Sequence, residues 1–247
     1  MTAPETPAAA SDAGTPFVTD AVRLVRVLFS PGAVYAEQEE QPTFWKPWLI
    51  VCVLWMVLQF LQRPFQTRVQ ELAMAQAGRT MPAGAGTGAV TYVVGGVTAF
   101  LTVLVMSALT AGILYLLMAG MGGETTYKKM LTVVIFTWPL ALLQQVLTFV
   151  VLTMRGVESI NSVWDMFVSF GPDLFLPADT QMSPFLRLFL AGISPLQIWG
   201  MVITAVGLMV LAKVSKGAAW TAAIISFLIT LAVGAGIGAF GIKAMGG

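Results

Sequence analysis

Five long stretches of this 247-residue chain contain no Asp, Glu, Lys or Arg, although the chain has 13 Lys and Arg and 12 Asp and Glu residues. The uncharged stretches are Pro47–Gln62, Thr80–Gly123, Met130–Met154, Leu188–Ala212 and Gly217–Ile242. All but the first exceed the about 20 residues with which an α-helix crosses a ~30 Å hydrocarbon core. The first reaches that length if Phe44 and Trp45 lie among the lipid headgroups and Lys46 extends its charge towards water. The pattern predicts an all-α membrane protein with five transmembrane helices.

Composition excludes several other classes. Hydrophobic residues make up 57% of the chain in continuous runs, whereas a transmembrane β-barrel shows short segments of alternating polarity. The chain has no His and a single Cys, Cys52, so neither a Ser–His nor a Cys–His catalytic pair can form. The net charge of +1 gives no sign of a nucleic-acid partner. We therefore expect no enzyme activity, no cofactor and no metal.

Two regions are expected along the chain. Residues 1–16 are rich in Pro, Ala, Ser and Thr, which predicts a disordered tail, and they lack the basic and apolar regions of a signal peptide. Residues 17–247 are expected to form one membrane domain. Its spans are predicted at about residues 44–62, 92–119, 130–153, 195–212 and 218–242.

The segment Phe17–Phe29 before the first span has the pattern of an amphipathic helix. Its broad apolar face includes Phe17, Leu24 and Leu28, and Arg23 lies on the opposite face. The segment is too short and too charged to cross a membrane. It either lies in the interface with its apolar face towards acyl chains, or it packs against the membrane domain of the same chain.

Further interfacial anchors are expected at aromatic residues. Trp45 and Trp48 mark the water–lipid boundary of the first span, where amphipathic rings are enriched. Between spans three and four, apolar residues of 160–170 recur at helical spacing and include Trp164. This spacing predicts a second amphipathic interfacial helix.

The third span carries the most polar candidate element. Pro139 should kink the helix near Ile135, because proline lacks an N–H and its ring clashes with the carbonyl four residues earlier. Gln144 and Gln145 follow at mid-span. These two amides either line a polar path or form hydrogen bonds to a neighbouring helix, and the kink is either a hinge or static.

Small residues suggest faces for close helix packing. Residues 236–241 match G-x-G-x-x-G, but they lie inside an apolar helix, whereas a dinucleotide site needs this motif between a strand and a helix. Gly234 and Gly238 instead form a G-x-x-x-G pair, and Ala108 with Gly112 offers a similar face in span two. Whether these faces meet each other or a second subunit is left open by the sequence.

Three motifs occur in order along nearly the whole chain. They are Leu28–Glu37, Gly122–Leu131 followed by Trp138-Pro139, and Ser194–Trp199 followed by Lys213–Ala218. Together they resemble the Yip membrane-domain family, named for the interaction of its members with Ypt and Rab GTPases. The resemblance implies five spans and a cytosolic amino terminus, and eukaryotic members act in vesicle budding and membrane shaping. The short, Ala-rich leader resembles the prokaryotic branch, for which no Rab partner is implied.

Two functional hypotheses follow. The first is a non-enzymatic integral membrane protein that organises the bilayer and either other membrane proteins or further copies of itself. The alternative is a transporter, lipid-handling protein or channel that uses the kinked, polar third span. The lysines of the shortest loops favour an amino terminus inside, in a bacterial inner membrane; these are Lys128, Lys129, Lys213 and Lys216.

Overall fold

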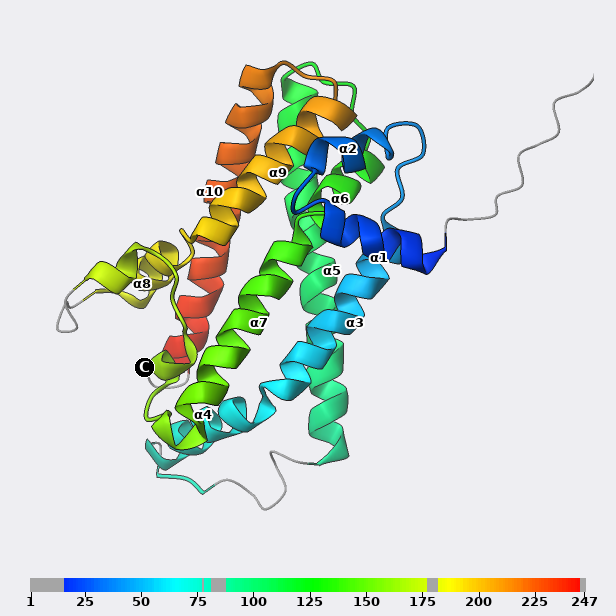
Figure 1. The fold of residues 1–247 in the computed structure, drawn as a ribbon. Helices are drawn as coiled ribbons and strands as arrows, with labels where there is room; N and C mark the ends of the chain where they lie inside the picture. The colour runs from blue at the N-terminus through cyan, green and yellow to red at the C-terminus, as the bar shows by residue number, and fades with distance from the viewer. Residues whose placement is uncertain (1–15, 77, 81–87, 177–181, 245–247) are drawn as a thin grey trace, which may run out of the picture.

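The computed structural model describes residues 16–76, 78–80, 88–176 and 182–244, and within these ranges every regular element is a helix (Figure 1). The predicted disordered tail, apart from Pro16, lies outside the described residues. The α-helices are α1 (Phe17–Arg26), α2 (Pro31–Ala36), α3 (Trp45–Leu61), α4 (Arg63–Gln76), α5 (Ala89–Gly120), α6 (Tyr127–Ile135), α7 (Trp138–Arg155), α8 (Pro184–Ala191), α9 (Pro195–Leu211) and α10 (Lys216–Ala244).

The long apolar helices are the candidate membrane spans. In the described chain, α5, the α6–α7 segment and α10 are each long and apolar enough to cross a bilayer. Two further pairs pass the same criteria together but are bent, by 55° between α3 and α4 and by 65° between α8 and α9. The described residues therefore form three candidate spans, or up to five if each bent pair counts as one, and the expected all-α membrane fold is confirmed.

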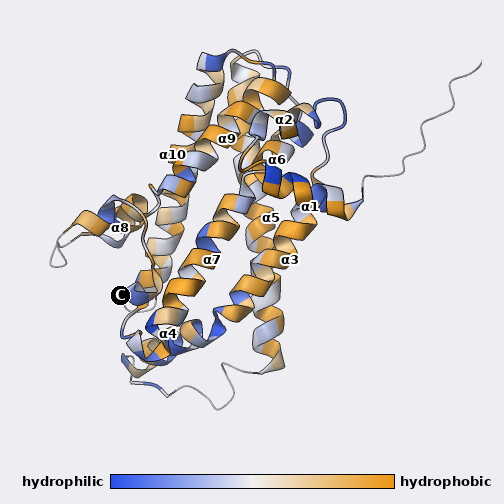
Figure 2. Cartoon of the chain, viewed as in Figure 1, coloured by the Kyte–Doolittle hydropathy of each residue, from blue (hydrophilic) through white to orange (hydrophobic). Residues whose placement is uncertain are grey.

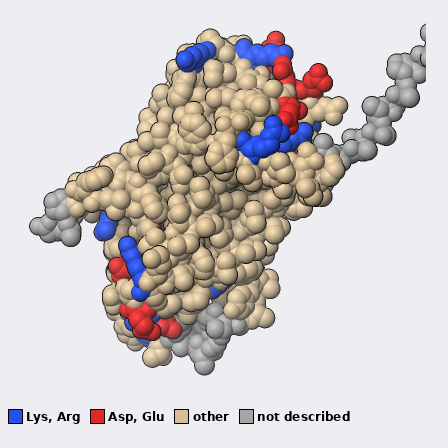
Figure 3. All heavy atoms as spheres, viewed as in Figure 1, with Lys and Arg blue, Asp and Glu red and all other residues tan. Residues whose placement is uncertain are grey.

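The surface between the two ends of the bundle is apolar and exposed, as expected of a surface that faces lipid. Only 22% of the most apolar stretch of α5 is buried by protein, and Val90 and Leu116 on this helix are more than 70% exposed. Apolar residues run along the spans (Figure 2), and the charged side chains on the visible face gather mainly towards the two ends (Figure 3). A soluble protein rarely exposes a continuous apolar belt of this size.

The core joins the spans to the short helix α2. Tyr35 of α2, Met130 of α6 and Leu208 of α9 are fully buried in one hydrophobic cluster. Burial of each such side chain stabilises a protein by about 1.5–3 kcal/mol. The Tyr35 hydroxyl donates a hydrogen bond to the Val133 carbonyl oxygen at 3.1 Å, and burial raises the pKa of this phenol, so it stays a neutral donor. Helix α2 is thus a part of the membrane domain.

The third span is interrupted where Pro139 predicts it. Helix α6 ends at Ile135, and α7 begins at Trp138. The Thr137 hydroxyl donates to the Val134 carbonyl oxygen at 2.7 Å, which satisfies one backbone acceptor at the break. The helix is therefore interrupted just before Pro139, and a role of this break as a kink or hinge stays a prediction.

The predicted helix over residues 160–170 is not formed. This connection contains three short 3₁₀ helices instead, η1 (Val157–Ser159), η2 (Val163–Met166) and η3 (Pro172–Phe175). The Asp165 carboxylate accepts hydrogen bonds from the backbone N–H groups of Asn161 and Ser162 at 2.9 and 2.8 Å. Such local side-chain bonds compete with α-helical ones. The α-helix between spans three and four is α8, which packs against α10.

Candidate functional site

Helix α1 lies across the start of α3 and has two opposite faces (Figure 1). Asp20 and Leu24 are buried against the protein, with 0% and 5% of their surface exposed. On the other side, apolar residues recur every three or four positions from α1 into the turn after it and are between 49% and 80% exposed. This outer stripe consists of Val18, Val22, Val25 and Phe29. Helix α1 is held by one face and presents the other outward.

The broad apolar face predicted for this segment is divided between two environments. Phe17 stays 47% exposed, with its ring edge-on to Trp45 at 5.8 Å. Leu24 lies in the core, and Leu28 packs against it while its carbonyl oxygen accepts a hydrogen bond from the Trp199 indole at 3.0 Å. Leu24 is therefore buried against protein, whereas Leu28 is only partly buried and its role as an interfacial anchor stays a prediction. The apolar residues span too wide an arc of the helix to face a single environment.

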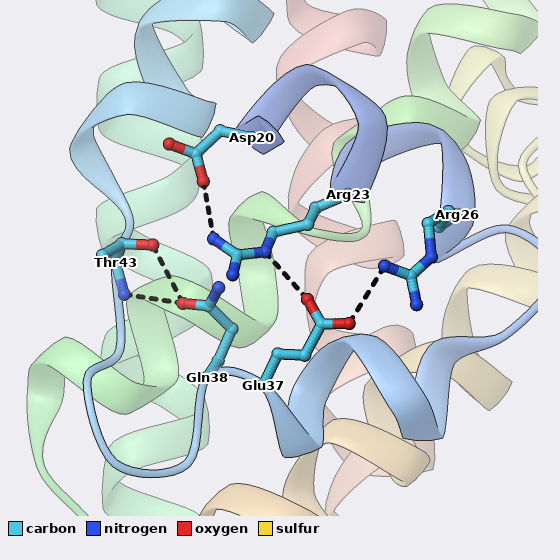
Figure 4. A network of polar contacts seen from close by, with 6 residues as sticks. All are labelled: Asp20, Arg23, Arg26, Glu37, Gln38 and Thr43. Atoms are coloured by element: carbon cyan, nitrogen blue, oxygen red, sulfur yellow. Dashed lines mark hydrogen bonds and ion pairs between the residues drawn. The ribbon is translucent and has the colours of Figure 1, made fainter. Parts of the chain in front are cut away.

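An ion-pair network, the clamp, fixes α1 to α2 (Figure 4). The Arg23 guanidinium contacts the Asp20 carboxylate at 3.2 Å and the Glu37 carboxylate at 3.0 Å. The Arg26 guanidinium contacts the other Glu37 oxygen at 2.9 Å. Hydrogen bonding from Arg23 is the main cause that lowers the pKa of Glu37, with Arg26 contributing. Glu37 is thus ionised at neutral pH and accepts from two arginines of α1.

Two further contacts tie the segment after α2 to the bundle. The Gln38 side-chain oxygen accepts hydrogen bonds from the backbone N–H and the hydroxyl of Thr43, at 2.8 and 2.9 Å. Lys213, after α9, pairs with Glu39 at 3.2 Å. Among the described residues no group of three or more His, Cys, Asp or Glu could hold a metal ion. Glu37 and Glu39 pair with cations of the same chain.

The predicted tryptophan anchors make contacts within the protein. Trp48 lies edge-on to Phe100 at 5.0 Å. Trp164 lies under the Arg187 guanidinium at 4.5 Å, which joins the 3₁₀ connection to α8. Trp45 is 51% exposed, and the Lys46 ammonium lies 5.5 Å from its ring. Whether these rings also lie among lipid headgroups stays a prediction.

The glutamines of α7 bond to two different neighbours. The Gln144 side-chain oxygen accepts from the Ser194 hydroxyl at 3.3 Å and from the Gln197 amide at 3.4 Å. The Gln145 amide lies 3.5 Å from the Gln62 side-chain oxygen, and the Gln62 amide donates to the Gln145 carbonyl at 3.4 Å. Of the two readings left open by the sequence, the structure contains the interhelical hydrogen bonds.

The small-residue faces of α5 and α10 are offset by one position from the predicted pairs. On α5 the buried small residues next to the predicted pair are Ser107 and Ala111, whereas a Cβ added at Gly112 would contact nothing within 4 Å. Ala108 contributes its carbonyl oxygen, which accepts from the Tyr127 hydroxyl at 2.9 Å.

On α10 the corresponding buried pair is Ala235 and Ala239. A Cβ added at Gly238 would lie 2.7 Å from a Leu188 methyl of α8, whereas one at Gly234 would contact nothing within 4 Å. Packing of Gly234 and Gly112 against another subunit stays a prediction.

A cavity of about 510 Å³ lies between the spans. Its wall includes Trp55 of α3, Thr102 of α5, Gln197 of α9 and Thr230 of α10. The Trp55 indole N–H is buried and has no hydrogen-bond partner among the described residues. The cavity wall is mainly apolar, with scattered hydroxyl, amide and indole groups.

A second cavity of about 430 Å³ lies where the α3–α4 elbow meets the start of α5. It contains Arg63, whose guanidinium donates a hydrogen bond to the Thr91 carbonyl oxygen at 2.6 Å and lies 5.9 Å from the Tyr92 ring. The guanidinium can come this close to the backbone of α5 only because residue 95 is glycine, since a Cβ added at Gly95 would lie 1.9 Å from it. Arg63 directly follows the predicted first span, and the proline after it, Pro64, is the one sequence signal for the elbow.

Comparison with known proteins gives a consistent picture. Residues 25–237 match the Yip1 domain. The chain is 28% identical over 211 residues to "Membrane protein YknW" of Bacillus subtilis (strain 168), which covers 85% of this chain and 87% of that relative. No solved structure matches the chain. The matched region includes Arg26 and Glu37 of the clamp and the cavity at the α3–α4 elbow, and it ends within α10.

Proposed function

Because the chain belongs to the Yip1 domain family, we propose that it is a non-enzymatic membrane protein that organises the bilayer and partner membrane proteins around it. The observation that carries this proposal is the outer stripe, which exposes four large apolar side chains on a helix held rigidly to the spans. Side chains of this kind gain about 1.5–3 kcal/mol each when they leave water. The stripe is therefore expected to enter the acyl boundary of one leaflet.

The clamp holds the inserted helix α1 at a fixed position relative to the spans. A free amphipathic helix would rotate and tilt independently of the spans. Helix α1 is instead fixed by Arg23 and Arg26 to Glu37, and α2 is fixed to α9 through the buried Tyr35. Lipid displaced by the outer stripe is thus displaced at a constant distance from the spans, which supports a role in shaping the membrane or in positioning a partner beside α1.

The expected location is a bacterial inner membrane with the amino terminus inside. The Bacillus relative supports a bacterial membrane. The orientation rests on the lysines near the α1–α2 end, including Lys213 and Lys216, because positive residues of short loops favour the cytoplasmic side. The bilayer is one partner, and another membrane protein or a second copy of this chain is the other.

Lipid handling is the second candidate, and the 510 Å³ cavity favours it. Its volume falls in the about 300–1,000 Å³ range of small-ligand sites, and the Trp55 indole supplies a donor without a partner in the described chain. Gln144 and Gln145 are not among the residues that line the cavity. A transport role would therefore use Trp55 and the α10 hydroxyls before it used the glutamine pair.

Two double variants separate the candidates. Val22→Asp with Val25→Asp puts carboxylates on the outer stripe, and its matched control, Val22→Leu with Val25→Leu, keeps the stripe apolar. Gln144→Leu with Gln145→Leu removes the amides of α7. We measure curvature of reconstituted vesicles, crosslinked neighbours in intact membranes, and lipid or solute movement across vesicles.

An organiser loses vesicle curvature and neighbours with the Asp pair and retains both with the Leu pair and with the α7 variant. Lipid movement that is abolished by Trp55→Phe, together with full activity of the Asp pair, would replace the organiser proposal with the lipid-handling one.

A further inference from the structure

The cavity at the α3–α4 elbow combines a cation with amide and hydroxyl groups. Arg63 lies in its wall together with Gln59, Gln66, Gln70 and Thr98. Among the described residues, none of those that line the cavity is acidic. Arg63 also forms no ion pair with any carboxylate of the described chain. This is unlike Arg23, Arg26 and Arg68, which all pair with carboxylates.

The Arg63 guanidinium is held in place but is left with donors to spare. It makes one hydrogen bond in the described chain, to the Thr91 carbonyl oxygen, out of the five N–H groups of a guanidinium. The Tyr92 ring and the bare backbone at Gly95 fix its plane. A fixed guanidinium with free N–H groups matches the two oxygens of a phosphate in a bidentate contact.

The position of the cavity indicates where such a phosphate would come from. The apolar helix α3 ends at Leu61, and α4 turns away by 55° to run across the end of the bundle (Figure 1). Lipid headgroups are expected at the level where a span ends. Beside the cavity, Val93, Val94 and Val97 of α5 are more than half exposed, and they provide an apolar wall for an acyl chain directly below a bound headgroup.

We propose that this cavity binds an anionic glycerophospholipid with a hydroxylated headgroup, of the phosphatidylglycerol type. Arg63 contacts the phosphodiester, and the amides of Gln59, Gln66 and Gln70 bond to the headgroup hydroxyls. A zwitterionic headgroup fits less well, because its ammonium group finds no acidic side chain among the described residues of the wall.

The test uses the full chain in mild detergent. Native mass spectrometry measures binding of phosphatidylglycerol and of phosphatidylethanolamine with identical acyl chains. Gly95→Ala displaces the guanidinium without removing a charge, and its matched control is Gly96→Ala, where an added Cβ meets only the Phe60 ring at an ordinary 3.7 Å. Arg63→Gln removes the charge, and Arg63→Lys restores the charge without the bidentate geometry.

We expect Gly95→Ala and Arg63→Gln to weaken phosphatidylglycerol binding at least about tenfold, the order expected for loss of a charge-assisted hydrogen bond. Gly96→Ala should bind as the wild type does, and Arg63→Lys should fall between. Thermal unfolding of each variant distinguishes loss of a site from loss of the fold, and a variant that unfolds at the wild-type temperature without binding supports the site.

Three results would overturn the proposal. The first is equal binding of the two lipids by the wild type. The second is unchanged binding in both Gly95→Ala and Arg63→Gln. The third is displacement of the lipid by millimolar inorganic phosphate, because the site would then recognise a free phosphate rather than a lipid.

Discussion

Arg23 and Arg26 near one end of the bundle and Arg63 near the other have opposite kinds of partner. At the α1–α2 end, Arg23 and Arg26 share Glu37, so the charges neutralise each other and serve to fix α1. At the α3–α4 end, Arg63 has a backbone carbonyl and an aromatic ring but no carboxylate partner in the described chain. The difference indicates that the first end is a closed structural joint, whereas the second is open to an anion.

The largest effect concerns whether the two ends lie on opposite sides of the membrane. In a Cys52→Ala background, single cysteines at Glu40 and Arg79 flank the α3–α4 pair, and those at Glu158 and Lys216 flank the α8–α9 pair. If each bent pair is one span, the members of each couple label from opposite sides with an impermeant thiol reagent. Labelling of both members of each couple from one side would leave only three spans. The α1–α2 region and the α3–α4 elbow would then not lie on opposite sides of the membrane.

The closed end should be sensitive to any loss of space between α2 and α9. A Cβ added at Gly207 would lie 2.8 Å from the Tyr35 ring and 3.1 Å from Val133. We expect Gly207→Ala to lower the free energy of unfolding by about 1–3 kcal/mol, as overpacking does. The control is Gly236→Ala on α10, where an added Cβ contacts nothing within 4 Å. Equal melting temperatures of the two variants in detergent would contradict the docking of α2.

Removing the shared carboxylate should have a smaller effect. Glu37→Gln keeps the size of the side chain but breaks both ion pairs of the clamp. Because this carboxylate is about one-third exposed, we expect a cost of about 1 kcal/mol or less. Proteolysis within residues 27–30 should become several times faster, since α1 would detach more often. An unchanged cleavage rate would show that packing of Leu24 alone holds α1.

The smallest effect that we expect is a pH dependence of the clamp. The pKa of Glu37 is lowered in the folded protein, so its stabilising contribution is complete above the unfolded value of about 4.3 and is lost as the pH falls through the folded value. The wild type should therefore lose part of its α1 docking only below about pH 4. Glu37→Gln should lack this step, and a step of equal size in that variant would assign it to another group.

Helices and their ends were largely predictable, because uncharged length and local chemistry determine them. Pro139 produced the break before α7, and Ser194 with Pro195 starts α9 where expected. Which side chains of each helix face the protein core was less predictable. Asp20 is fully buried and Val22 exposed, because the ion pairs with Arg23 and the packing on the spans decide how α1 is rotated, and neither can be read from helical period alone.

The open end was the least predictable part of the molecule. The sequence shows Arg63 and Gly95 as unrelated residues 32 positions apart (95 − 63). Their contact depends on the angle between α3 and α4 and on how α5 lies beside the elbow. Likewise, the one-position offset of the buried small residues on α5 and α10 depends on helix rotation, which an apolar segment of almost uniform composition leaves undetermined.

The central claim, that the outer stripe of the clamped helix α1 lies in lipid, can be tested by the depth of a label at Val22. In the Cys52→Ala background, a fluorophore on Val22→Cys is compared with one on Glu40→Cys in reconstituted vesicles. Quenchers attached to acyl chains should quench the Val22 label several times more than a water-soluble quencher does, and the Glu40 label should show the reverse. Preferential quenching of the Val22 label from water would contradict the account.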